Sequence, residues 1–95
     1  MRGGWIYIMT NRLNGTPYIG VTNDIARRVH EHRTGIGGEF TSRYGLTRLV
    51  YVEWREDIRT AIQREKNMKD WPRAWKARLI GRTNPEWRDL YDDLI

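Results

Sequence analysis

The chain has 95 residues, the size of one compact domain, so residues 1–95 are expected to share one core with any active site on its surface. It contains no cysteine, which excludes disulfide bonds and metal sites built from thiolates. Its 17 basic and 12 acidic residues give a net charge of +5, which suits a polyanionic partner.

The first third of the chain predicts two neighbouring strands followed by a helix. The first apolar run is rich in β-forming residues on both faces, which indicates a buried central strand. Asn14-Gly15 separates it from a second such run and indicates a hairpin turn with positive φ, so the strands should be antiparallel. Thr22-Asn23-Asp24 supplies an N-cap for the helix, and Gly35 a stop. The expected elements are strands over 5–9 and 17–21 and a helix over 24–34.

The rest of the chain predicts one further strand and several helices. Asp57 is a good N-cap for a long helix, Pro72 ends that helix and suits the start of the next, and Asn84 starts a last helical turn or two. The expected elements are a short helix over 39–44, a strand over 48–54, and helices over 57–71, 73–81 and 84–94. Apart from the short helix, the order β-β-α-β-α-α-α predicts an α+β fold, a three-stranded antiparallel sheet flanked by helices.

Tyr7 and Tyr18 each lie inside an apolar strand of the predicted hairpin. Alternate residues of a strand share a face, so Tyr18 and Gly20 lie on the same side of theirs. Gly20 leaves a shallow gap beside Tyr18, and glycine inside a strand often marks the close approach of a ligand or another backbone. The alternative is that both tyrosines belong to the core with their hydroxyls at its rim, and that Gly20 forms a bulge.

Two polar residues border the apolar face of the first helix. Ile25 and Val29 define that face, and Arg28 and His32 lie one turn apart beside it, whereas Arg27 points towards solvent. We therefore expect Arg28 and His32 to lie near the sheet that carries the tyrosines. The alternative is an arginine that buries only its aliphatic stem and a histidine at the core rim.

Glu65 falls on the apolar stripe of the helix that begins at Asp57. Glutamate is rarely buried without a partner, so this side chain must pair with a cation, bind a metal or face a cleft. An ion pair with an arginine and a role as a hard-metal ligand both remain open, because Mg²⁺ is usually held by one or two carboxylates with water and substrate phosphates. The stripe consists of Ile58, Ala61, Ile62 and Met68.

Other kinds of site have little support in the sequence. There is no phosphate-binding P-loop, no pair of zinc ligands, and no nucleophile-elbow context around Ser42. No apolar run resembles a signal peptide or reaches the ~18 residues of a membrane span, so a cytoplasmic protein without membrane contact is expected. Residues 86–95 carry a net charge of −3, so the first 85 residues carry +8. This basic part of the chain suits a nucleic-acid partner, and the alternative is a solvated basic surface with no such partner.

The spacing of the two tyrosines resembles that of the GIY-YIG nuclease family. Tyr7 is followed by ten residues and then by the intact second motif, Tyr18-Ile19-Gly20. The first motif departs from the family name, since Trp5-Ile6-Tyr7 has no glycine but keeps the tyrosine. The resemblance extends over nearly the whole chain, to the small bacterial members that are little more than a catalytic domain. Supporting segments are residues 18–24, 40–44 and 84–88.

Three further residues match the family's ordered set. Arg28 follows Tyr18 by ten residues, as the family's catalytic arginine does, and His32 lies one turn later at a position that is His or Tyr in the family. Glu65, inside the segment 64–71, resembles the family's metal-binding glutamate. The set of Tyr, Tyr-Ile-Gly, Arg, His and Glu in this order is specific, whereas the paired tyrosines alone are weak.

The resemblance implies a divalent-metal-dependent nuclease that hydrolyses phosphodiester bonds, of DNA in preference to RNA, in repair, recombination or other DNA processing. It implies one Mg²⁺ or Mn²⁺ ion held by Glu65 and no small-molecule cofactor. Either tyrosine would accept the proton of the attacking water, Arg28 would neutralise charge on the phosphate, and His32 would orient a tyrosine or contact the phosphate. Gly20, Arg27 and Arg43 are candidates for contact with nucleic acid, and Tyr44 could stack on a base, although core packing is its simpler role.

Two alternatives to an enzyme are retained. One is a non-catalytic nucleic-acid-binding module on the same fold, which would bind in a salt-sensitive way without cleavage. The other is a docking subunit of a larger complex, with Trp75 and Trp87 near the acidic C-terminal segment as its contact surface. Helix packing is the simpler role for these tryptophans. The sequence does not indicate oligomeric state, strandedness of the substrate or a cleavage motif.

Overall fold

The computed structural model describes residues 2–36, 38 and 43–94, and its elements follow the predicted order. The elements are β1 (Gly4–Thr10), β2 (Tyr18–Thr22), α1 (Ile25–Arg33), β3 (Arg48–Arg55), α3 (Ile58–Lys69), α4 (Arg73–Thr83) and the 3-10 helix η1 (Tyr91–Leu94). Of the short helix expected over 39–44, residues 39–42 lie outside the described residues, and Arg43 and Tyr44 are helical.

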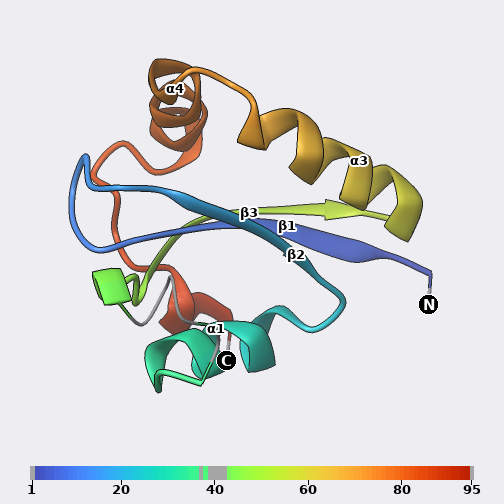
Figure 1. The fold of residues 1–95 in the computed structure, drawn as a ribbon, viewed down its shortest axis with the longest axis horizontal. Coiled ribbons are helices and arrows are strands. Elements are labelled where there is room, and N and C mark those ends of the chain that lie inside the picture. Colours follow the sequence, from blue (N-terminus) through green and yellow to red (C-terminus); the bar gives the residue numbers. More distant parts are fainter. Residues whose placement is uncertain (1, 37, 39–42, 95) are drawn as a thin grey trace.

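The sheet has the strand order β2-β1-β3, and both pairs are antiparallel. β1 is therefore the central strand, which explains why residues 5–9 are apolar on both faces. α3 and α4 lie on one side of the sheet, and α1 and η1 lie on the other (Figure 1). This arrangement confirms the predicted α+β fold, in which helices flank a three-stranded antiparallel sheet.

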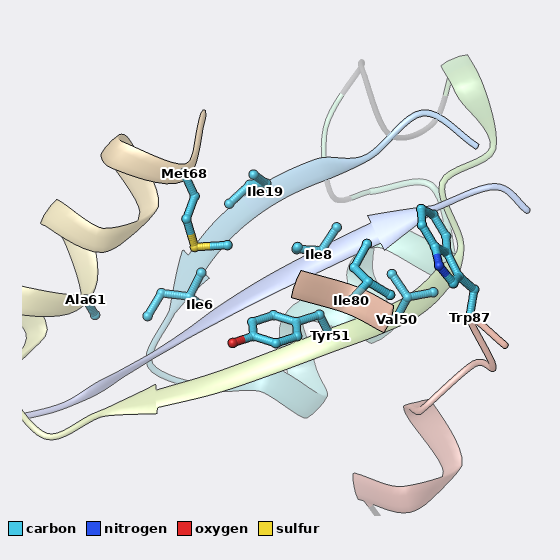
Figure 2. Close-up of a cluster of buried hydrophobic side chains, with 9 residues drawn as sticks. All are labelled: Ile6, Ile8, Ile19, Val50, Tyr51, Ala61, Met68, Ile80 and Trp87. Carbon is cyan, nitrogen blue, oxygen red and sulfur yellow. The ribbon is translucent and has the colours of Figure 1, made fainter. Parts of the chain in front are cut away.

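Each face of the sheet has its own core. β1 sends Ile6 and Ile8 to the side of α3, where Met68 lies with them in Figure 2. It sends Tyr7 and Met9 to the side of α1. The first cluster consists of Ile6, Ile8, Ile19, Val50, Tyr51, Ala61, Met68, Ile80 and Trp87, and the second of Tyr7, Met9, Ile25, Val29, Leu46 and Leu49. The alternation of β1 thus places the first tyrosine on the α1 side.

The hairpin connection differs from the tight turn that Asn14-Gly15 suggested. Residues 11–17 all lie between the strands, and the positive φ belongs to Asn14, at 57°, and not to Gly15. The amide of Gly15 donates to the carbonyl of Arg12 at 2.9 Å, which closes a turn within this longer loop. The antiparallel pairing was predicted correctly, because it depends on the two β-rich runs more than on the turn type.

The helix boundaries follow the predicted caps. The Asp24 carboxylate accepts from the amide of Arg27 at 3.2 Å, and Asp57 accepts from the amide of Arg59 at 2.9 Å, which satisfies donors that have no partner inside their helices. Gly35, just beyond α1, has a φ of 87°, and Pro72 immediately precedes α4. No helix in the described part of the chain is long and apolar enough to cross a membrane.

The last helical turn starts later than expected, at Tyr91 and not at Asn84, because Asn84 ends α4. The Asn84 side chain is buried, donates to the carbonyls of Val50 and Arg88 at 3.1 and 2.8 Å, and accepts from the amide of Arg88 at 3.0 Å. These bonds hold a loop against β3, and Trp87 turns into the core with a φ of 54°. Only Tyr91–Leu94 is helical.

Candidate active site

The first tyrosine is fixed over the glycine of the second motif. Tyr7 in β1 pairs directly with Gly20 in β2, and a Cβ atom on Gly20 would stand 2.5 Å from Cζ and 2.9 Å from Cε1 of the Tyr7 ring. The gap expected beside Tyr18 is therefore filled by the neighbouring strand's phenol, and Tyr7 is only 1% exposed. Gly20 has no side chain because the Tyr7 ring takes that space.

His32 completes an aromatic cluster with the two tyrosines. Its Nε2 atom lies 2.9 Å from the Tyr7 hydroxyl, and its ring centroid lies 5.7 Å from that of Tyr7 and 5.5 Å from that of Tyr18. His32 is 1% exposed and not at the core rim, because α1 lies against the sheet face that carries both tyrosines. The expectation that α1 faces the tyrosines is thus met, and the histidine lies deeper than its helix position suggested.

Burial keeps the two hydrogen-bonded groups neutral. It raises the pKa of Tyr7 to about 12, with further increases from the charges of Tyr18 and Glu65, while Arg28 acts in the opposite direction. Burial also lowers the pKa of His32 to about 4, and the positive charge of Arg28 lowers it further. At neutral pH the pair is therefore a phenol and an uncharged imidazole beside a permanent cation.

Arg28 lies at the open side of this cluster. Its side chain is 33% exposed, its guanidinium interacts with Tyr7, and Glu31 pairs with it at 3.0 Å. Glu31 holds the guanidinium from the helix side, and the exposed part remains accessible to a ligand. Arg28 thus lies near the sheet tyrosines, as expected, and its acidic neighbour Glu31 was not predicted.

Glu65 approaches the cluster from α3. Its side chain is only 13% exposed, and its charge contributes to the raised pKa of Tyr7, so the carboxylate lies within electrostatic range of the phenol. Of the alternatives left open for Glu65, an ion pair is present, but its partner is Lys69, at 3.1 Å and one turn further along α3, and not an arginine. Arg64, the preceding residue, pairs with Glu53 of β3 instead.

A hollow of about 390 Å³ lies at the outer edge of β2, next to these groups. We call it the β2-edge hollow, and it is lined by Pro17, Tyr18, Ile19, Lys69 and Lys76. It brings the half-buried Tyr18 together with the lysine that pairs with Glu65. The two lysines are functional candidates that sequence reasoning missed, although the i,i+4 spacing of Glu65 and Lys69 was a signal for the first.

The donor set at Glu65 fits a hydrated hard cation. Within the described residues, no group of three or more His, Cys, Asp or Glu side chains could enclose a metal ion. Glu65 is a single, largely buried carboxylate whose ion-pair partner Lys69 lines the β2-edge hollow, and it would leave the other positions of a bound ion to water and phosphate oxygens. Glu65 is therefore the candidate ligand for a divalent cation in this cluster.

Two of the predicted arginines are exposed to solvent. The Arg27 side chain is 65% exposed and lies 4.0 Å from Asp24, and Arg43 is exposed in the helical turn before Gly45. Tyr44 is 48% exposed, so it is not the core residue that its type suggested. A role of Arg27 and Arg43 in contacting nucleic acid stays a prediction.

The family model for the GIY-YIG catalytic domain matches residues 3–78, a span that contains the whole cluster. The chain belongs to the GIY-YIG family. Similar proteins include UPF0213 proteins of Bacillus cereus, 36% identical over 76% of this chain and 75% of the relative, and of Clostridium perfringens, 34% identical over 80% and 81%. The solution NMR structure of a UPF0213 protein from Bacillus halodurans is also similar, with 26% identity, 92% coverage of each chain and a TM-score of 0.57.

The buried histidine of this GIY-YIG domain predicts a stability that falls in weak acid. The pKa of His32 is about 4 in the folded protein and near 6.5 when unfolded, so the unfolded state binds more protons between these values. Protonation of His32 in the unfolded state therefore leaves the folding stability unchanged above pH 6.5 and lowers it progressively as pH falls towards 4. We expect urea unfolding to show a loss of about 2 kcal/mol between pH 7 and pH 5.

The same titration in two variants separates His32 from other groups. His32→Gln should flatten this part of the pH dependence, whereas His30→Gln, at an exposed position of the same helix, should keep it. Equal pH dependence in wild type and His32→Gln would show that the imidazole is not the responsible group.

Proposed function

We propose that this GIY-YIG domain is a divalent-metal-dependent nuclease that hydrolyses phosphodiester bonds, of DNA in preference to RNA, in cytoplasmic DNA repair or processing. The observation that carries the proposal is the convergence of Tyr7, Tyr18 and His32 beside the cation of Arg28, within range of the Glu65 charge. A core tyrosine pair would need neither a guanidinium nor a largely buried carboxylate next to it. Phosphodiester hydrolysis uses both.

Two charged residues would handle the phosphate. Arg28 presents a fixed positive charge with part of its side chain in solvent, which suits neutralisation of the charge that develops on the phosphate. Glu65 would hold one Mg²⁺ or Mn²⁺ ion, which when bound supplies Lewis-acid stabilisation of the leaving oxygen. Lys69 would exchange its ion pair with Glu65 for a phosphate oxygen in the β2-edge hollow.

The two tyrosines would have different tasks. Tyr7 is 1% exposed, hydrogen-bonded to His32, and has a pKa of about 12, so it is poorly placed to contact water or to lose its proton. Tyr18 is half-buried, lines the β2-edge hollow and lies within electrostatic range of Arg28. We therefore propose that Tyr18, acting as its phenolate, accepts the proton of the attacking water, and that Tyr7 and His32 position Arg28.

Cleavage by the purified chain tests the proposal. Labelled single- and double-stranded DNA and RNA are incubated with Mg²⁺ or Mn²⁺, and EDTA should stop cleavage. Arg28→Ala should lower the cleavage rate about 10²-fold, because one electrostatic contact to the transition state is removed. Arg59→Ala is the control, since that side chain is 87% exposed and pairs with Asp57 at the start of α3. Salt-sensitive binding without metal-dependent cleavage would favour the non-catalytic binding module instead.

A further inference from the structure

A second cleft of about 260 Å³ lies between α3 and α4, and the proposed nuclease mechanism does not use it. We call it the α3–α4 cleft, and it is lined by Arg64, Trp71, Trp75, Arg78, Leu79 and Arg82. The two helices lie on the side of the sheet opposite α1 (Figure 1). The cleft is smaller than the pockets of ~300–1,000 Å³ that enclose small-molecule ligands, so it has room for one ring system of a longer ligand.

The cleft presents an aromatic surface to solvent. Trp75 is 50% exposed, so the expected helix packing does not account for this residue, whereas Trp87 is buried. The rings of Trp71 and Trp75 meet edge to face, with centroids 6.0 Å apart. The Arg64 guanidinium lies 5.0 Å from the Trp71 ring centroid and is held in place by Glu53. Arg64 thus fixes the position of Trp71, and the indole of Trp75 remains accessible to solvent.

The charge of the cleft is entirely positive. None of its lining residues is acidic, and Arg78 and Arg82 are exposed one turn apart on α4. Within the described part of the chain, neither of these two arginines takes part in an ion pair, whereas Arg64 is neutralised by Glu53. Two accessible guanidiniums next to an open indole combine a stacking surface with charge for phosphates.

The α3–α4 cleft and the proposed active site lie on different sides of α3. Arg64 turns towards Glu53 of β3 and lines the cleft, while the next residue, Glu65, pairs with Lys69 and acts on Tyr7. Along α4, Trp75, Arg78 and Arg82 line the cleft, while Lys76 lines the β2-edge hollow. A nucleic-acid molecule that contacted both places would have to cross α3 and α4.

We infer that the α3–α4 cleft binds a single-stranded segment of the nucleic-acid substrate, with a base stacked on Trp75 and adjacent phosphates on Arg78 and Arg82. The inference rests on the proposed function, and it specifies the substrate as one that carries an unpaired stretch beside the cleavage point. Bases within a duplex are stacked on each other and cannot turn onto the indole. An unpaired base has a free face, so the cleft distinguishes single strands from duplex.

Binding measured without cleavage tests this assignment. Fluorescence anisotropy of a labelled oligothymidylate is recorded in EDTA, so that no hydrolysis occurs. Trp75→Ala should weaken binding about five- to 150-fold, the range for loss of one stacked base. Trp54→Ala is the matched control, because Trp54 is 46% exposed, lies on β3 against Trp5 and does not line the cleft. Arg78→Ala should reduce the log–log salt slope by about 0.7, the value for one phosphate contact on a single strand.

Trp75→Phe keeps an aromatic ring and should recover most of the affinity, which separates stacking from general damage to the helix. Equal affinity of Trp75→Ala and Trp54→Ala for the oligonucleotide would overturn the inference. So would displacement of the oligonucleotide by polyglutamate at equal charge concentration, because the cleft would then recognise acidic chains of any kind.

Failure of this inference can be distinguished from failure of the proposed function. Glu65→Gln should bind oligothymidylate as wild type does while it loses cleavage. If the wild-type protein binds through Trp75 but cleaves no substrate with any divalent metal, the nuclease proposal fails and the single-strand site stands. If it cleaves and Trp75→Ala has no effect on binding, only the cleft assignment fails.

Discussion

Glu65→Gln should remove metal-dependent cleavage, lowering the rate at least about 10³-fold, while the protein stays folded. Glutamine has nearly the same shape but no charge, so a divalent cation loses its protein ligand and the several kcal/mol of transition-state stabilisation that it supplies. The folded state loses only an ion pair with a half-exposed lysine one turn away, which contributes about 0.3–0.5 kcal/mol. Activity and stability therefore separate clearly in this variant.

Cleavage rates over a range of Mn²⁺ concentrations, together with urea unfolding, provide the measurement. Glu86→Gln is the control, since Glu86 is exposed and lies in the loop after α4. It should cleave as wild type does. Metal-dependent cleavage by Glu65→Gln at the wild-type rate would contradict the assignment of Glu65 as the metal ligand.

Gly20→Ala should damage both stability and activity through a single methyl group. The added Cβ would lie 2.5 Å from Cζ of Tyr7, so the ring must move away from β2 and strain its hydrogen bond to His32. Overpacking of a core costs about 1–3 kcal/mol. The moved phenol would also shift Arg28, and displacement of a catalytic group by about 1 Å can cost 10²-fold in rate.

Gly81→Ala is the matched control, because a Cβ at this position of α4 meets nothing within 4 Å. Alanine favours helix over glycine, so this variant should gain about 0.5–1 kcal/mol and keep its activity. Urea unfolding and the cleavage rate are measured for both variants. A Gly20→Ala protein as stable and as active as wild type would mean that the Tyr7 ring is not confined by β2.

Local chemistry predicted most of the fold correctly. The signals that were correct depend on neighbours in sequence, and the structure has the elements they indicated. They are the apolar runs around Tyr7 and Tyr18, the N-caps Asp24 and Asp57, and the helix end at Pro72. Asn84 was misassigned because asparagine suits both ends of a helix. Its actual role depends on Val50, which is 34 residues away and cannot be identified from local pattern.

Which residues lie together in the candidate site could be predicted from the sequence, but not how deeply they are buried or which partners they have. Helical periodicity placed His32 beside the apolar face, but how deeply it is buried depends on the sheet that lies opposite. In the same way, Gly20 suggested a free space, and only the strand register shows that Tyr7 fills it. The exposure of Trp75 also depends on how α4 is turned, which the weak apolar pattern of that helix does not specify.

β2 and β3 are the two outer strands of the sheet, and different residues lie along their outer edges. Along β3, the C-terminal segment supplies hydrogen bonds, from the amide of Leu90 to the carbonyl of Leu49 at 2.8 Å and from the amide of Leu49 to the Asp89 carboxylate at 3.2 Å. β2 has Lys69 and Lys76 beside it, so a second copy approaching that edge would bring like charges together. Shortening the chain before Asp89 would therefore uncover β3 as a template for intermolecular sheet formation, and aggregation would begin there and not at β2.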